Sequence, residues 1–203
     1  MTLSSQPVWE DALRAELTRI SHRTYNRGLV RGSGGNISAR FDDRTMLVTP
    51  SGVTLGDTSP ENIVKASLTS DEWVPNDPFI PSKEYRFHAA IYQARPDVNA
   101  IVHCHPPHAT AYAVRKLDIP KVTDAAFKQP AMLHVPFAPS GSTQLVENVA
   151  AAVAGQTAFK VILLDEHGIV SVGKDLLTAF IWADLAEEMA QIAFISSQIN
   201  LPG

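Results

Sequence analysis

Residues 101–105, Ile101-Val102-His103-Cys104-His105, end an apolar run with two histidines placed two positions apart. Such a run predicts a buried β-strand, in which the side chains of residues i and i+2 leave the same face. The two histidines would then lie roughly 6.6 Å apart along the strand, at about 3.3 Å per residue. Imidazoles that converge from this spacing can bind one metal ion, for which Zn–N distances are about 2.0–2.1 Å. Cys104 would point to the opposite face, so we do not expect it to be a ligand.

A third metal ligand must come from elsewhere in the chain, where five further histidines are available. His167 is favoured, because it follows an apolar run and because Gly168 permits a close backbone approach. The alternative interpretation of His167-Gly168 is an ordinary hairpin turn, and spacing alone leaves both open. His134, in a short expected strand, also remains possible as a ligand. The other three are expected to pack in a helix or to support the site from outside: His22, His88 and His108.

Alternating helix and strand patterns run through the chain without a composition break, repeat or linker, so we expect one domain over residues 1–203. Antiparallel hairpins are expected at 37–49 and 160–172, and further strands at 62–68 and 133–135. The expected helices cover residues 8–26, 82–94, 106–116, 142–154 and 174–199. This pattern favours an α/β fold with a mixed or mainly antiparallel sheet flanked by helices on both faces. Periodicity does not give the strand order.

Composition is that of a soluble globular protein. Of the 203 residues 45% are apolar and 19% charged, which is enough for a sizeable core. The net charge of −4 argues against a nucleic-acid partner, since such proteins carry a basic patch. No stretch approaches the ~18 uninterrupted apolar residues of a membrane span, and the first residues do not resemble a signal peptide. With a single cysteine and no intrachain disulfide, we expect a cytoplasmic protein.

Three short stretches can bind an anion. Gly32-Ser33-Gly34-Gly35-Asn36 is only superficially similar to a dinucleotide fingerprint, because it follows a helix and precedes a strand. Its backbone amides can still form an anion-binding concavity. Pro50-Ser51-Gly52 and an expected helix start at Ser82 are two further elements of this kind. Each alone is first a turn or a cap, but together they predict a small anionic substrate.

Glu84 stands at the start of the helix expected from Ser82. An acidic residue in this position often does no more than complement the helix dipole. The alternative is a carboxylate beside a metal-bound substrate, acting as general base and acid.

Five segments carry these features in a defined order. They are Ser33-Gly-Gly-Asn-Ile-Ser38, Thr49-Pro-Ser-Gly52, Pro81-Ser-Lys-Glu-Tyr-Arg-Phe-His88, Arg95-Pro-Asp-Val-Asn-Ala-Ile-Val-His-Cys-His105 and Glu166-His-Gly168. In order and spacing the set resembles the class II aldolase/adducin family over about residues 10–195. The resemblance implies a three-layer α/β/α fold around a mainly antiparallel sheet. It also implies a homotetramer with active sites between neighbouring subunits.

The resemblance further implies roles for individual residues. It places metal ligands at His103, His105 and His167 and the catalytic acid/base at Glu84. The expected ion is Zn²⁺, with Mn²⁺, Co²⁺ or another divalent ion as alternatives. Phosphate-binding positions of the family fall on Ser33, Asn36, Ser51, Gly52, Ser82 and Lys83. The implied activity is a lyase that cleaves a carbon–carbon bond by a retro-aldol reaction, through a metal-stabilised enediolate, in a small sugar phosphate or related hydroxy-ketone.

Three departures from the aldolases of this family leave the substrate open. Lys83 stands where those enzymes have a second serine, so that the anion pocket gains a cation that could serve a phosphate or a carboxylate. Val122-Thr123-Asp124 stands in place of a tyrosine, and the chain ends at Gly203, before a tail that supplies another tyrosine. Alternatives within the family are a decarboxylase or 4-epimerase that acts on a sugar acid, its phosphate or a pentulose phosphate. A non-catalytic adducin-like scaffold is remoter, since it has no need for three histidines with Glu84.

Overall fold

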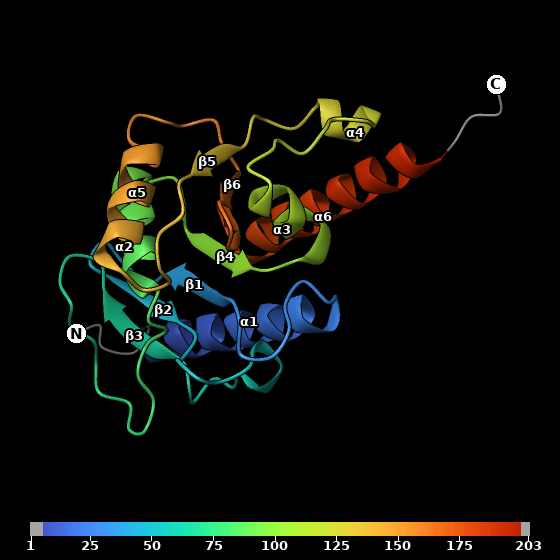
Figure 1. Ribbon diagram of the computed structural model, residues 1–203. Helices are drawn as coiled ribbons and strands as arrows, with labels where there is room; N and C mark the ends of the chain where they lie inside the picture. Colours follow the sequence, from blue (N-terminus) through green and yellow to red (C-terminus); the bar gives the residue numbers. More distant parts are fainter. Residues whose placement is uncertain (1–5, 200–203) are drawn as a thin grey trace.

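A computed structural model describes residues 6–199 of the chain as alternating strands and helices (Figure 1). The strands are β1 Asn36–Arg40, β2 Thr45–Val48, β3 Val64–Ser67, β4 Ala100–Cys104, β5 Leu133–Val135, β6 Val161–Leu164 and β7 Gly168–Gly173. The helices are α1 Gln6–Asn26, α2 Tyr85–Ala94, α3 Pro107–Val114, α4 Asp124–Phe127, α5 Thr143–Val153 and α6 Leu176–Gln198, with a short 3-10 helix, η1, at Leu55–Asp57.

All seven strands form one sheet in the order β3-β2-β1-β4-β7-β6-β5. Every neighbouring pair is antiparallel except β5 and β6, which are parallel. The two expected hairpins are therefore confirmed as β1–β2 and β6–β7, and the sheet is mainly antiparallel. β4 lies at its centre, where His103 is paired with Asn36 of β1 and with Val170 of β7.

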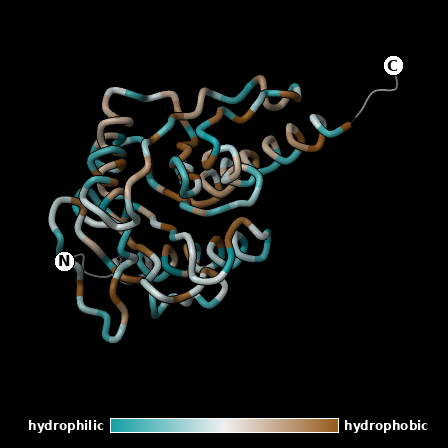
Figure 2. The backbone as a smooth tube through the Cα atoms, in the orientation of Figure 1, coloured by the Kyte–Doolittle hydropathy of each residue, from teal (hydrophilic) through white to brown (hydrophobic). Residues whose placement is uncertain are grey.

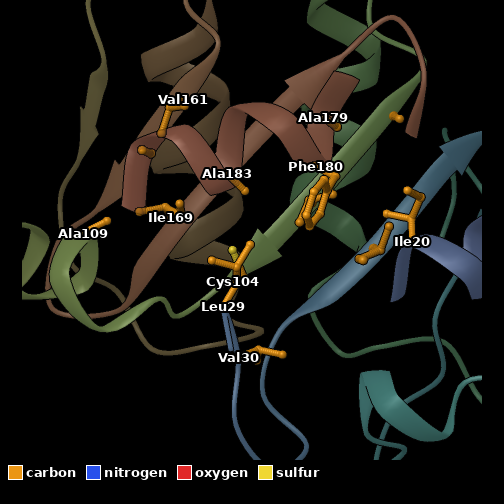
Figure 3. Packing of buried hydrophobic residues seen from close by; sticks show 14 of the residues in the cluster. Ile20, Leu29, Val30, Cys104, Ala109, Val161, Ile169, Ala179, Phe180 and Ala183 are labelled. Atoms are coloured by element: carbon orange, nitrogen blue, oxygen red, sulfur yellow. The ribbon is translucent and has the colours of Figure 1, made fainter. Parts of the chain in front are cut away.

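Helices cover both faces of the sheet. α2 and α5 pack together on one face, and α1, α3 and α6 on the other (Figure 1). Successive residues of β4 enter opposite layers: Ile101 belongs to the core under α2 and α5, whereas Val102 and Cys104 belong to the core under α1, α3 and α6. The expected orientation of Cys104 is confirmed. Figure 3 shows it among apolar side chains such as Leu29 and Ala183, and this burial raises the pKa of its thiol.

Two features differ from the sequence expectation. The helix expected from Ser82 begins at Tyr85, because Ser82–Glu84 form a turn in which the Tyr85 amide donates to the Ser82 carbonyl. The segment between α3 and β5 contains the short helix α4, which the Thr123 side chain caps by accepting from the Ala126 amide. A helix of four residues has no periodicity for a sequence pattern to reveal.

The far end of α6 projects from the body of the molecule, and hydrophobic and hydrophilic stretches alternate along it (Figure 2). Three large apolar side chains near this end are exposed: Ile192, Phe194 and Ile195. Within residues 6–199, no helix has the length and apolar character needed to cross a membrane.

Candidate active site

Three histidine rings meet at the carboxyl end of β4. His103 is the fourth residue of that strand, His105 follows it, and His167 comes from the turn between β6 and β7. One ring nitrogen of each can be chosen so that all three lie within 4.8 Å of one another. The Nε2 atoms of His103 and His105 are 3.2 Å apart. His103, the residue just after β4 and the turn histidine thus converge on one point.

The donor set fits a divalent metal ion. Four tetrahedral ligands at Zn–N distances of about 2.0–2.1 Å have nitrogens about 3.3–3.4 Å apart, close to the separation of the two strand histidines. His103 donates from Nδ1 to the Ile169 carbonyl at 2.9 Å, which leaves its Nε2 free to bind. Burial and the neighbouring rings lower the pKa of His105 to about 3. Neutral imidazoles are the form that binds metal.

The histidines need glycines beside them. A Cβ on Gly168 would lie 2.5 Å from Cδ2 of His105 and 2.7 Å from the Cys104 carbonyl oxygen. Gly35, at a φ of +70°, would bring a Cβ within 2.7 Å of the His103 carbonyl oxygen. These two positions admit no side chain, which explains why glycines flank both sequence motifs.

Glu84 points at the histidine cluster from the N-terminus of α2. It occupies the N-cap position but makes no side-chain capping bond, so it does not serve as an ordinary helix-start residue. Its Oε2 lies 3.2 Å from Nε2 of His103, and its Oε1 lies 3.4 Å from Nε2 of His167. The side chain is 5% exposed. The expected place in the first turn of a helix is therefore wrong, and the side chain lies beside His103 and His167.

Two neutral side chains hold the Glu84 carboxylate. Asn36 donates from Nδ2 to Oε2 at 2.9 Å, and Ser140 donates from Oγ to Oε1 at 2.7 Å. Burial alone would raise the pKa of this carboxyl, but the neighbouring His103 and His167 rings and the Ser140 hydroxyl bring it well below its usual value. Glu84 is consequently a carboxylate at neutral pH.

These groups open into a cleft of about 390 Å³, here called the histidine cleft. It is lined by Ser33, Gly34, Gly35, Asn36, Pro50, Ser51, Gly52, Ser82, Lys83, Glu84, His105, Ser140 and His167. All six residues expected to bind an anion are in this set, whereas His103 lies behind it, fully buried. Pockets for small molecules commonly have volumes of about 300–1,000 Å³.

Lys83 is exposed at the histidine cleft. The pKa of His167 is lowered to about 4, first by burial, then by the neighbouring His103 ring, and in part by the charge of Lys83. The positive charge of Lys83 therefore acts on His167 of the histidine cluster.

The backbone amides expected to bind an anion are partly engaged already. The Ser51 amide donates to the Ile80 carbonyl, and the Ser82 amide donates to the Thr49 carbonyl. These bonds join the two loops into one wall of the cleft. Ser82 also stands three residues before α2, so the expected helix N-terminal anion site at Ser82 is wrong. The groups of this wall that remain available to bind an anion are the hydroxyl groups and the backbone amides that have no partner within the wall.

The remaining histidines have partners outside the cluster. His88 is fully buried, with Nδ1 at 2.7 Å from the Ser38 hydroxyl. His108 pairs with Glu187 at 2.8 Å, and His22 bonds the Thr58 carbonyl. His134 lies between two carboxylates, those of Asp118 and Asp165.

Sequence reasoning missed Ser140, which contacts Glu84 across 56 positions of sequence. A signal for it existed, because Pro139-Ser140-Gly141 repeats the tripeptide Pro50-Ser51-Gly52. Both tripeptides place a serine on the histidine cleft.

Comparison with known proteins shows that the chain matches a known family. The model of the class II aldolase and adducin N-terminal domain matches residues 15–194. The chain belongs to the class II aldolase/adducin family. Family relatives include an L-fuculose phosphate aldolase of Methanococcus maripaludis, 34% identical over 91% of this chain and 98% of the relative. A 3-oxo-tetronate 4-phosphate decarboxylase of Pectobacterium atrosepticum is 37% identical, over 92% of this chain and 85% of the relative.

A solved family structure, L-fuculose 1-phosphate aldolase, superposes with a TM-score of 0.82 at 28% identity, covering 100% of this chain and 92% of that one. The α/β fold around a mainly antiparallel sheet is thereby confirmed as that of class II aldolases. Because relatives of similar identity have different activities, family membership does not choose between aldol cleavage and decarboxylation.

Proposed function

We propose that this chain is a metal-dependent lyase, which cleaves a carbon–carbon bond of a small sugar phosphate or related hydroxy-ketone by a retro-aldol reaction. The observation that carries the proposal is the buried Glu84 carboxylate beside the Nε2 atoms of His103 and His167. A non-catalytic scaffold has no physical need to bury an ionised carboxylate against three converging imidazoles, since burial of charge is costly.

His103, His105 and His167 are the proposed ligands of a divalent ion, Zn²⁺ in the first instance. The bound ion would act as a Lewis acid on substrate oxygens. His103 contributes rigidity, because its ring is fully buried and its Nδ1 is fixed by the Ile169 carbonyl. Three neutral imidazoles leave the charge of the ion uncompensated by ligands, and Glu84 supplies the nearby negative charge.

Glu84 is the proposed acid/base. In a retro-aldol cleavage a substrate hydroxyl loses its proton, the adjacent carbon–carbon bond breaks, and its electron pair remains with the ketone fragment until that fragment is protonated. One carboxylate can accept the first proton and return it in the second step. Asn36 and Ser140 each donate a hydrogen bond to one oxygen of this carboxylate.

The phosphate of the substrate would bind to the wall formed by the loops around Ser33, Ser51 and Ser82. Their hydroxyls are neutral donors, and Lys83 adds the positive charge. A charge-assisted hydrogen bond of this kind contributes about 1.5–3 kcal/mol. Asn36 differs from the serines, because its Nδ2 is engaged by Glu84 and its Oδ1 has no hydrogen-bond partner among the described residues.

Decarboxylation of a sugar-acid phosphate is the second candidate. The observation in its favour is that the cation Lys83 lines the same cleft as the serine hydroxyls on which a phosphate would bind. The histidine cleft could then accommodate two anionic groups, a phosphate and a carboxylate. A relative that acts, by its name, on 3-oxo-tetronate 4-phosphate supports this candidate.

The test is a direct comparison of substrates with the metal-loaded protein. L-fuculose 1-phosphate, 3-oxo-tetronate 4-phosphate and a pentulose phosphate are offered separately, and products are identified by mass spectrometry. Cleavage of the substrate into an aldehyde and a ketone supports the retro-aldol lyase. Release of carbon dioxide supports the second candidate, and formation of an isomeric pentulose phosphate would point to an epimerase. No turnover of any anionic substrate by metal-loaded protein would contradict the proposal.

We also propose a homotetramer with active sites between subunits, formed by one-domain chains in the cytoplasm. Support for assembly comes from apolar side chains that a single chain leaves in water near the end of α6: Ile192 is 37%, Phe194 51% and Ile195 49% exposed. Exposed apolar patches of this kind mark interaction surfaces. Sedimentation velocity would show a species four times the chain mass, and a monomer at micromolar concentration would contradict the assembly.

A further inference from the structure

We infer that Ser140 is a positioning residue, which fixes the Glu84 carboxylate for proton transfer through its hydroxyl. The inference rests on the proposed function, because it concerns the proposed acid/base. Ser140 lies on the loop between β5 and α5, far in sequence from the family motifs around Glu84 and the histidines. Its Oγ donates to Oε1 of Glu84 at 2.7 Å.

The two carboxylate oxygens of Glu84 have matched surroundings. Oε2 accepts from Asn36 at 2.9 Å and lies 3.2 Å from the His103 ring. Oε1 accepts from Ser140 and lies 3.4 Å from the His167 ring. The terminal torsion of a glutamate is broad, so packing alone does not fix the plane of the carboxylate. A donor on each oxygen does fix it, and the donor on Oε1 is Ser140.

The backbone around Ser140 is itself well defined. The Ser142 amide donates to the Pro139 carbonyl at 3.0 Å, and Gly141 has a φ of +75°, as expected for the third residue of a type II turn. A Cβ on Gly141 would lie 3.2 Å from the Lys83 carbonyl oxygen, so the turn packs against the residue before Glu84. Ser142 then begins α5 by accepting from the Leu145 amide. The turn at Pro139–Ser142 therefore fixes the position of the Ser140 hydroxyl, and the turn itself is anchored because Ser142 caps α5.

The other Pro-Ser-Gly tripeptide provides an internal comparison. Gly52 has nearly the same φ, +76°, but a Cβ there would meet nothing within 4 Å. The space beside Gly52 is therefore open at the cleft, where a substrate anion could approach, whereas Gly141 packs against Lys83 next to Glu84. Equal sequences at the same cleft have different surroundings, and this difference assigns Ser140 to Glu84 instead of to the anion wall.

Serine is also the suitable residue type. A hydroxyl both donates and accepts, so its contact with Oε1 persists when Glu84 holds the transferred proton. The Nδ2 group of Asn36 can only donate. A threonine at position 140 would preserve the hydroxyl, and an alanine would remove it with little change in the turn.

The experiment compares Ser140→Ala, Ser140→Thr and Ser142→Ala, each loaded with Zn²⁺ and assayed on whichever of L-fuculose 1-phosphate and 3-oxo-tetronate 4-phosphate the unsubstituted protein turns over. Ser140→Ala should lower kcat about tenfold to a hundredfold, with KM and metal content nearly unchanged. Ser140→Thr should restore most of kcat. Ser142→Ala, the control in the same turn, should lower Tm through loss of the α5 cap and leave kcat unchanged.

A double-substitution test shows whether Ser140 acts through Glu84. In a Glu84→Gln background, Ser140→Ala should cause little further loss, and an equal, independent loss would overturn the inference. A rise in KM alone for Ser140→Ala, or an unchanged kcat, would overturn it as well. Full activity of Glu84→Gln would instead overturn the proposed function. Inactive Glu84→Gln beside fully active Ser140→Ala would overturn only the role of Ser140.

Discussion

Two hollows lie at opposite ends of the central strand β4, and they differ in what lines them. The histidine cleft at the carboxyl end measures about 390 Å³. A groove at the amino end, here called the apolar groove, measures about 620 Å³ and is lined by Trp9, Ala12, Leu13, Glu16, Ala39, Arg40, Phe41, Asp42, Asp43, Asn99, Lys174, Asp175, Leu176 and Leu177. Among the described residues, none that lines the larger hollow is a histidine.

The contrast shows that volume and apolar surface do not identify the site in this fold. At the carboxyl end of β4, buried polar groups converge, and their pKa values move far from the usual range, downward for His105 and His167. Such convergence is costly to keep without a ligand or a reaction to use it. At the amino end the charged residues of the groove belong to an ordinary protein surface.

The largest effect is expected from the metal ligands. His103→Ala, His105→Ala and His167→Ala should each lose bound metal and activity together, because two imidazoles hold a dication poorly. Metal content per chain, measured by emission spectroscopy beside activity, checks this. The unsubstituted protein should bind one ion per chain. Full metal content in His167→Ala would remove it from the ligand set and make His134 the next residue to test.

Glu84→Gln should have the next largest effect. The amide keeps the shape of the side chain but cannot accept a proton, so kcat should fall about 10²–10⁴-fold while metal content and Tm are retained. Steady-state kinetics with parallel metal analysis measures this. A loss of only a few-fold would show that Glu84 has a structural role at the start of α2, and the contrast between the two ends of β4 would lose its main support.

Much of this site follows from local sequence, and the rest depends on distant contacts. The spacing of His103 and His105 on an apolar run predicts that both side chains leave one face. In the structure β4 ends at Cys104 and His105 follows it, and the Nε2 atoms of the two histidines lie 3.2 Å apart. The hairpin that brings His167 back to β4 was likewise predicted from two short apolar runs. Both hairpins are present in the sheet.

The turn at Ser82–Glu84 and the contact of Ser140 could not be derived in this way. An acidic residue such as Glu84 is typical of the first turn of a helix. However, the Ser82 amide donates to the Thr49 carbonyl of another loop, and the helix begins only at Tyr85. Ser140 reaches Glu84 because β5 lies at one edge of the sheet and the loop after it packs against Lys83, just before α2, an arrangement that no local pattern encodes. Contacts between segments distant in sequence, and not local helix propensity, determine both the start of α2 and the contact of Ser140 with Glu84.

A smaller and more selective effect is expected at Lys83. Lys83→Ser should raise KM for an anionic substrate about tenfold to over a hundredfold, with a smaller change in kcat, since it removes ground-state binding of the anion. Initial-rate measurements over a range of substrate concentrations separate the two constants. If KM is unchanged for every anionic substrate tested, Lys83 points to solvent and the serine wall alone binds the anion.

The smallest effect is expected in the apolar groove. Leu177, on the first turn of α6, is 39% exposed in that groove. Leu177→Ser should change the free energy of unfolding by no more than about 0.5 kcal/mol, as for most surface positions, and leave kcat and KM unaltered. Chemical denaturation and the same kinetic assay measure both. A large loss of kcat would mean that the two ends of β4 are coupled.

We propose that the histidine cluster and Glu84 form a metal-dependent carbon–carbon lyase site. The most direct measurement removes divalent metal with a chelator, restores Zn²⁺ stepwise and follows carbon–carbon bond cleavage of the phosphorylated substrates. Activity should be absent from the metal-free protein and rise in proportion to bound Zn²⁺ up to one ion per chain, and Glu84→Gln should bind the same ion without regaining activity. Cleavage by metal-free protein at the full rate, or saturation of the site without any cleavage, would contradict the account.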